Sequence, residues 1–142
     1  MKIALYGKKS DAVEKILREK GVGIVPFESN GFDLLISYGG DGAMLGSELA
    51  CPGRLKMPIR DRETAPYCPK HSLEWQIGAL LEGHLKETSL MKLVGTVGGI
   101  EHYAINDIFI HNTNNVSALR YQVKIDDDLY AREVVGDGVG VS

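Results

Sequence analysis

A strand, a tight turn and the start of a helix are encoded in Phe32-Asp33-Leu34-Leu35-Ile36-Ser37-Tyr38-Gly39-Gly40-Asp41-Gly42-Ala43-Met44-Leu45. The run from Phe32 to Ser37 is mostly apolar and has the length of a strand. Ala43 to Ala50 carries apolar residues at partly helical spacing. The Gly-Gly-Asp-Gly sequence between them predicts a tight turn, because glycine adopts backbone angles that other residues avoid. We therefore expect a strand, a glycine turn and a helix in direct succession.

This turn is a candidate phosphate site. Backbone N–H groups lie free at the positive end of a helix, and such an end binds phosphate well. Gly39, Gly40 and Gly42 would supply these groups. Asp41 would repel a phosphate, so we expect it to take a proton from an attacking hydroxyl or to handle Mg²⁺. The alternative is an ordinary turn in which Asp41 caps the helix.

The glycine spacing excludes two common phosphate motifs. No Lys-Ser/Thr pair follows the glycines, so the turn is not a Walker A loop. The arrangement Gly39-Gly40-x-Gly42 also differs from the Rossmann fingerprint. The turn therefore needs another explanation.

Composition limits the classes of function. A chain of 142 residues with a net charge of −3 can form one ordinary domain or two very small ones, and the charge gives no strong case for nucleic acid. The sequence has no apolar run long enough to span a membrane, and its apolar N-terminus is too short for a signal peptide. Cys51 and Cys68 lack metal-site spacing and are expected to be reduced thiols. We expect a cytoplasmic protein with no membrane or nucleic-acid partner.

Residues 1–89 are predicted to form an α/β layer, a parallel sheet with helices. The predicted strands are Lys2–Gly7, Val22–Phe27 and Phe32–Ser37. A first helix is predicted with Ser10 or Asp11 as its cap and Gly21 as its C-terminal stop, and another is predicted from Ser72 to Glu87. Ser72 is expected to cap the last of these helices. Ligands of such sheets bind at the carboxyl ends of the strands, where Asp41 is expected to lie.

The segment from Cys51 to His71 has several prolines and no clear periodicity. A short strand is predicted over Lys56–Ile59. Four cations lie close in sequence to the glycine turn: Arg54, Lys56, Arg60 and Arg62. They either bind donor phosphates or form a solvated loop face.

From residue 90 onward the apolar residues alternate with a period of two, which is typical of strands. We expect an antiparallel β-meander, or the beginning of a β-sandwich, over residues 90–142. Its strands are predicted at Met91–Val97, Glu101–Ile105, Ile108–His111, Leu119–Ile125 and Leu129–Val135. Asp126 to Asp128 is expected to be a hairpin turn rather than a Ca²⁺ site, which needs more ligands at set spacing.

Three motifs together resemble those of the NAD kinase family. Gly39-Gly40-Asp41-Gly42 after an apolar strand resembles the signature of these kinases and of their relatives, the phosphofructokinases and the diacylglycerol and sphingosine kinases. Asn106-Asp107 resembles the family's Asn-Glu/Asp motif. Val135–Ser142 resembles the segment that leads into its Ser-Thr-Pro-Thr-Gly-Ser-Thr-Ala-Tyr run. The chain thus resembles the N-terminal portion of an ATP- or polyphosphate-dependent NAD kinase, ending just before the Thr-Pro-Thr-Gly-Ser-Thr-Ala-Tyr part.

The resemblance implies phosphoryl transfer from ATP or polyphosphate to the 2′-hydroxyl of the adenosine ribose of NAD, giving NADP. Asp41 would be the catalytic residue. The glycine amides would hold the donor phosphates, which Mg²⁺ or another divalent cation would bridge. Asn106 and Asp107 would grip the adenosine and Asp137 would lie near the nicotinamide, while no metal site on the protein itself is implied. Residues 1–89 would be the nucleotide-phosphate domain, and residues 90–142 an incomplete NAD-binding domain.

The sequence also departs from the family. Ala43 stands where the family has Thr, Pro58–Glu63 replaces an Asn-Leu-Gly segment, and Ser142 matches only the first residue of the Ser-Thr-Pro run. A fragment, one half of a split protein and a natural short protein all remain open. We expect an uncovered apolar face in the β-region, a homo-oligomer, and little or no turnover by this chain alone. The alternatives are a lipid kinase of the same superfamily and a non-catalytic dinucleotide-binding module.

Overall fold

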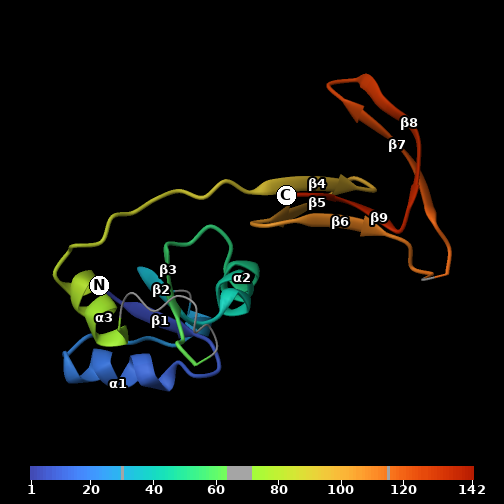
Figure 1. Cartoon of the computed structure of the whole chain (residues 1–142). Helices are drawn as coiled ribbons and strands as arrows, with labels where there is room; N and C mark the ends of the chain where they lie inside the picture. The colour runs from blue at the N-terminus through green and yellow to red at the C-terminus, as the bar shows by residue number, and fades with distance from the viewer. Residues whose placement is uncertain (30, 64–71, 115) are drawn as a thin grey trace. The chain divides into compact units, whose positions relative to one another are not determined.

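A computed structural model describes residues 1–29, 31–63, 72–114 and 116–142 (Figure 1). The chain divides into two compact units, Met1–Glu87 and Thr88–Ser142, which we describe one at a time. The boundary expected from the sequence fell two residues later. Cys68 and the second half of the Cys51–His71 segment lie outside the described residues.

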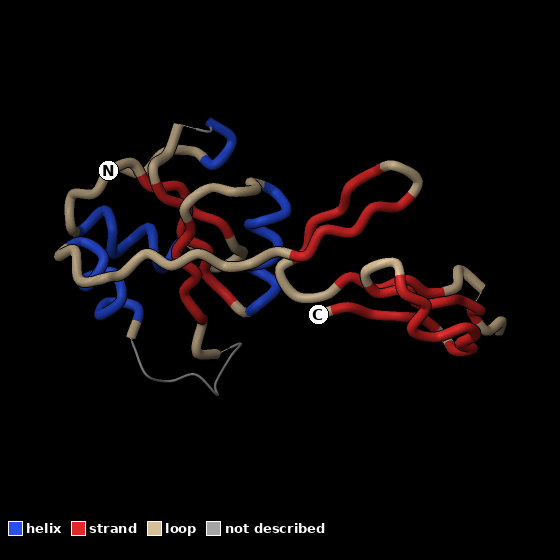
Figure 2. Tube along the Cα trace, turned by 90° about the horizontal axis from the view of Figure 1, so that it is seen from above, coloured by secondary structure: helices blue, strands red, loops and turns tan. Residues whose placement is uncertain are grey.

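The first unit contains a three-stranded parallel sheet in the order β1-β2-β3. Its strands are β1 (Ile3–Tyr6), β2 (Leu34–Gly39) and β3 (Lys56–Arg60). Its helices are α1 (Asp11–Glu19), α2 (Asp41–Ala50) and α3 (Leu73–Leu81). Figures 1 and 2 show the sheet between α1 and α3 on one face and α2 on the other. The predicted parallel sheet with helices, and the short strand over Lys56–Ile59, are confirmed.

Alternate residues of β2 build two cores, because successive side chains of a strand point to opposite faces. Leu34 and Ile36 pack with Leu17 of α1 and Ile77 of α3. Leu35 packs on the other face in a smaller cluster that includes Ala4, Phe32 and Cys51, the last of which is a buried free thiol. Burial on both faces holds β2 firmly at the centre of the sheet.

Glycines mark the ends of α1 and α3, and a serine marks the start of α3. Gly21 follows α1 with a φ of 70°, as the sequence predicted. Ser72 caps α3, since its hydroxyl accepts from the N–H of Trp75 at 3.1 Å. The helix ends at Leu81 rather than at the predicted Glu87, because Gly83 adopts a φ of 73° and the chain closes there with a hydrogen bond from the N–H of His84 to the carbonyl of Ala79.

The strand predicted over Val22–Phe27 is wrong. Ile24 forms only an isolated parallel bridge with Ile3. Pro26 has no N–H to donate, and the chain continues as a 3₁₀ turn, η1 (Phe27–Ser29). The segment therefore lies along the edge of β1 without extending the sheet.

The second unit is antiparallel, as predicted. Its strands are β4 (Leu93–Val97), β5 (Ile100–Ala104), β6 (Ile108–His111), β7 (Leu119–Ile125), β8 (Asp128–Gly136) and β9 (Gly138–Val141). They pair as β4-β5, β6-β9 and β7-β8, so the last hairpin is inserted between the partners β6 and β9, unlike a simple meander. Asp126 and Asp127 have positive φ angles of 49° and 69° and make the predicted turn between β7 and β8.

The two units differ in how far their side chains are buried. None of the described residues from 88 to 142 is buried, and the aliphatic and aromatic side chains of the strands stay half-buried or exposed. The exposed apolar face expected for the β-region is present in this unit. Among the described residues, every helix is too short or too polar to cross a lipid bilayer.

Candidate functional site

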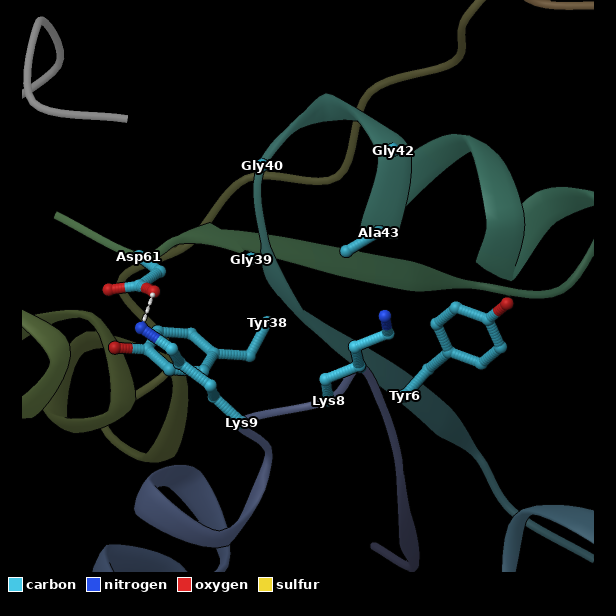
Figure 3. Close-up of a pocket in the computed structure, with 10 residues that line it drawn as sticks. Tyr6, Lys8, Lys9, Tyr38, Gly39, Gly40, Gly42, Ala43 and Asp61 are labelled. Carbon is cyan, nitrogen blue, oxygen red and sulfur yellow. Dashed lines mark hydrogen bonds and ion pairs between the residues drawn. The ribbon is translucent and has the colours of Figure 1, made fainter. Parts of the chain in front are cut away.

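A cavity of about 620 Å³ lies at the carboxyl edge of the parallel sheet, where ligands were expected. Its walls come from the segments that follow β1, β2 and β3 and from the first turn of α2 (Figure 3). The lining residues are Tyr6, Gly7, Lys8, Lys9, Tyr38, Gly39, Gly40, Gly42, Ala43 and Asp61. The cavity therefore includes all three glycines predicted to hold phosphate.

Two glycines let the strand ends approach one another. Gly7 has a φ of +125°, and a Cβ added there would lie 2.2 Å from the carbonyl oxygen of Tyr38. Gly39 has a φ of +151°, and its added Cβ would lie 2.9 Å from the Cβ of Ala43. Both positions need glycine, since a side chain would meet strain and a clash together. These two glycines shape the floor of the cavity.

Gly40 and Gly42 have a different role. A Cβ added at either would meet no described atom within 4 Å, so neither is needed for packing. Their missing side chains leave the backbone open toward the cavity. Backbone that is open to solvent suits a ligand that approaches closely, as a phosphate does at a glycine turn.

Helix α2 begins at Asp41, two residues before the predicted Ala43. Gly40 is the N-cap and Asp41 the first helical residue, so the expected capping position of Asp41 is wrong, while the alternative of an ordinary turn stays open. The N–H of Ala43 donates to the carbonyl of Gly40 at 3.0 Å. Helix geometry leaves the N–H groups of Asp41 and Gly42 without an intrahelical acceptor, which makes them available to an anion.

The carboxylate of Asp41 is engaged by Arg60. Nη2 of Arg60 lies 2.5 Å from Oδ1 of Asp41, and 70% of the Asp41 side chain is exposed. Register explains the pair, because Arg60 lies opposite Gly39 at the end of β3. Asp41 thus stands beside the glycine turn with its charge partly balanced, rather than among the residues found to line the cavity.

A second ion-pair cluster closes the far side of the cavity. Nζ of Lys9 lies 3.0 Å from Oδ2 of the buried Asp61 and 2.6 Å from Oε2 of Glu63. The hydrogen bonds that Lys9 donates to Glu63 and to Asp61 hold the pKa of Lys9 well above the usual lysine range. Burial, with a smaller effect of the Asp61 charge, raises the pKa of the neighbouring Tyr38. Lys9 is therefore a fixed part of the wall.

Arg54, Lys56 and Arg60 of the central segment each contact a described structural partner. Arg54 lies over the ring of Phe32, 4.9 Å from its centroid, and donates to the Phe32 carbonyl at 2.8 Å. Lys56 lies 2.6 Å from Glu48, with both side chains largely buried. Arg60 holds Asp41. These contacts help to fix β3 and α2, and the two predicted roles of the cations, binding donor phosphates or forming a solvated loop face, stay predictions.

The predicted NAD-binding residues lie in the second unit. Asn106 and Asp107 are exposed neighbours in the connection between β5 and β6. Asp137 lies between β8 and β9. Because Ile108 pairs with Val141 and His111 with Gly138, Asp107 and Asp137 stand at opposite ends of the β6-β9 pair. The structure does not bring Asp137 to the other two, and the roles of all three stay predictions.

Sequence reasoning missed Lys8, Lys9 and Asp61. Their positions in the sequence could have identified them. The lysines directly follow the first predicted strand, and Asp61 follows the short strand in the central segment. The carboxyl ends of parallel strands meet at one edge, so polar residues there converge. Tyr6 and Tyr38, the aromatic walls, are the last residues before the glycines that end β1 and β2.

A magnesium site on the protein alone has little support. The described residues contain no group of three or more His, Cys, Asp or Glu side chains that could hold a metal. The two carboxylates at this edge, Asp41 and Asp61, each pair with a cation. Magnesium in nucleotide sites takes one or two carboxylates together with substrate phosphates. We therefore assign no catalytic step to a protein-held metal.

Comparison with known proteins gives a fold match and no sequence match. No protein-family model matches the chain, and no curated protein matches it. Among solved structures, the chain is similar to an NAD kinase from Archaeoglobus fulgidus in complex with ATP, with a TM-score of 0.66 and 18% identity. The match covers 97% of this chain and 59% of that kinase, so the chain spans about three-fifths of its length. At this identity the comparison shows a shared fold.

Proposed function

We propose that this chain carries the phosphate-donor site of an NAD kinase-type phosphotransferase. One observation carries the proposal: a glycine turn opens helix α2 at the carboxyl edge of a parallel sheet, beside a cavity of about 620 Å³ that the glycines leave open. The fold shared with an NAD kinase that was crystallised with ATP supports it. The donor would be ATP or polyphosphate, and the acceptor the adenosine ribose of NAD.

The reaction would use the chain's residues as follows. The phosphate chain accepts hydrogen bonds from the N–H groups at the start of α2. The 2′-oxygen of the ribose attacks the terminal phosphorus, the bond from that phosphorus to its bridging oxygen breaks, and the shortened donor leaves. Asp41 accepts the proton of the attacking hydroxyl. A divalent cation bound to the donor phosphates would neutralise their charge. Asn106 and Asp107 would hold the adenosine and Asp137 would lie near the nicotinamide.

A non-catalytic phosphate-binding or dinucleotide-binding module is the second candidate. It is favoured by the Arg60–Asp41 pair, which ties up the carboxylate that would accept the proton. In that case the glycine turn would bind phosphate and the acid would serve only to place Arg60. Binding without turnover, unaffected by Asp41→Asn, would favour this function.

The test is NADP formation from NAD, ATP and Mg²⁺, with the chain and, where its natural protein is longer, with that whole protein. Asp41→Asn is compared with Asp11→Asn, since Asp11 is also the first residue of a helix and is exposed. We expect Asp41→Asn to reduce turnover by about 10²-fold or more, a typical effect for loss of a general base, and Asp11→Asn to leave it unchanged.

Two other results would redirect the proposal. If turnover survives Asp41→Asn, Asp41 does not accept the proton of the attacking hydroxyl. ATP binding without any NADP in either protein would favour the binding module.

A further inference from the structure

Two adjacent lysines follow β1 and point in different directions. Lys9 turns to Asp61 and Glu63, and two carboxylates balance its charge. Figure 3 shows the amino group of Lys8 pointing the other way, under the first turn of α2 near Ala43. Within the described part of the chain, Lys8 has no ion-pair partner. Lys8 is thus the lining cation whose charge the cavity leaves unbalanced.

The surroundings of Lys8 make this arrangement unfavourable without an anion. The start of a helix carries partial positive charge, and a lysine near it is repelled. Asp41, the acid of this turn, is directed to Arg60, and Asp61 is directed to Lys9. An anion between Lys8 and the glycine turn would remove the repulsion and gain a charge-assisted hydrogen bond.

We propose that Lys8 is the cation that binds the phosphate chain of the donor in this cavity, so that the site takes two or more linked phosphates. This inference rests on the proposed phosphate-donor site and adds the residue that selects the chain over a single phosphate. The backbone N–H groups at Asp41 and Gly42 would hold one phosphate, and Lys8 the next along the cavity. The cavity volume of about 620 Å³ gives room for more than one phosphate group. A nucleoside triphosphate and an inorganic polyphosphate share this chemistry.

The test is calorimetric titration of the 142-residue chain with ATP, inorganic tripolyphosphate and AMP. The variants are Lys8→Met, Lys8→Arg and Lys15→Met. Lys15 is an exposed lysine on α1 away from the cavity lining, so its variant makes the same charge change elsewhere. We expect Lys8→Met to weaken ATP and tripolyphosphate by about tenfold or more. Lys8→Arg should recover most of the affinity, and Lys15→Met should change it less than about twofold.

Each outcome decides the inference. A loss with both ATP and tripolyphosphate in Lys8→Met supports it, and a loss with ATP alone would assign Lys8 to the nucleoside and overturn it. Equal weakening of AMP would show a single-phosphate site and also overturn it. Equal binding of ATP by Lys8→Met and Lys15→Met would overturn the role of Lys8 and leave the proposed donor site intact. No binding of ATP or tripolyphosphate by the unaltered chain would overturn the donor site together with the inference.

Discussion

The two units of the chain use apolar residues in opposite ways. In the first, Ile36 of β2 is 0% exposed and packs among Leu17 and Ile77, with helices on both faces of the sheet. In the second, Phe109 is 68% and Tyr130 is 77% exposed, although both lie on strands that pair with a neighbour. Hydrogen-bond pairing follows from local alternation and turns, whereas burial needs another layer to cover each face.

The difference also concerns function. The first unit holds the glycine turn, Asp41 and the cavity within itself, on strands that its own core fixes. The second unit holds Asn106, Asp107 and Asp137 in connections between strands, and its two-stranded pairs bury little. A donor site on a packed sheet can be preformed, since packing and the core hold its backbone in place. The residues predicted to bind the acceptor lack that support in the described part of the chain.

The largest expected effect tests the core directly. Ile36→Ala should lower the free energy of unfolding of the first unit by about 3 to 4 kcal/mol, because it leaves a cavity in a fully packed site. Ile110→Ala, at a position 50% exposed, should change the stability of the second unit by less than about 0.5 kcal/mol. Urea unfolding followed at Trp75, the single tryptophan, measures the first change, and amide hydrogen exchange of the β6-β9 pair measures the second.

An equal loss from Ile110→Ala would break the comparison. It would mean that the apolar face of the second unit is covered in solution, as self-association would cover it.

The next prediction concerns glycines with positive φ in each unit. Gly7→Ala should destabilise the first unit by about 2 to 3 kcal/mol, because the new Cβ meets the Tyr38 carbonyl oxygen. Gly98 in the β4-β5 turn has a φ of +58° and open space around it, so Gly98→Ala should cost about 1 kcal/mol locally. The Trp75 transition reports the first change, and amide hydrogen exchange of the β4-β5 hairpin reports the second. If Gly7→Ala were harmless, β1 and β2 would not approach each other as described.

The smallest effect is on the pH dependence of stability. The pKa values of Lys9 and Tyr38 are both raised in the folded state, so the folded form holds these protons more tightly. Their contribution is therefore complete below about pH 10, the unfolded pKa range of both groups, and is lost as the pH rises above it. Tyr38→Phe should make the alkaline fall in stability less steep. Tyr130→Phe, in the second unit, is the matched control, and an unchanged slope in Tyr38→Phe would contradict the burial of Tyr38.

Much of the fold was predictable because its signals are local. The strand pattern of the sequence located β4 to β8 of the second unit but not β9, and Ser72 and Gly21 marked helix ends. The strand prediction over Val22–Phe27 was wrong because Pro26 lacks the backbone N–H that a further strand would need for pairing. The end of α3 was missed because Leu85, which continues the apolar stripe, was given more weight than the stop at Gly83.

The glycine turn of the site could be predicted from the sequence, but the partners of its charged side chains could not. Gly39, Gly40 and Gly42 follow one another closely, so their place in a turn can be read directly from the sequence. The Lys9–Asp61 pair joins residues 52 positions apart, and the Arg60–Asp41 pair depends on the register of β2 and β3. Such contacts become visible only once the order of the strands is known.

The most direct test of the donor site is amide chemical-shift mapping of the ¹⁵N-labelled chain during titration with ATP and Mg²⁺. The account predicts saturable shifts that are largest at Gly40, Gly42 and Ala43 at the start of α2 and at Lys8 after β1. Shifts confined to the second unit, or no saturable shifts at the glycine turn, would contradict it.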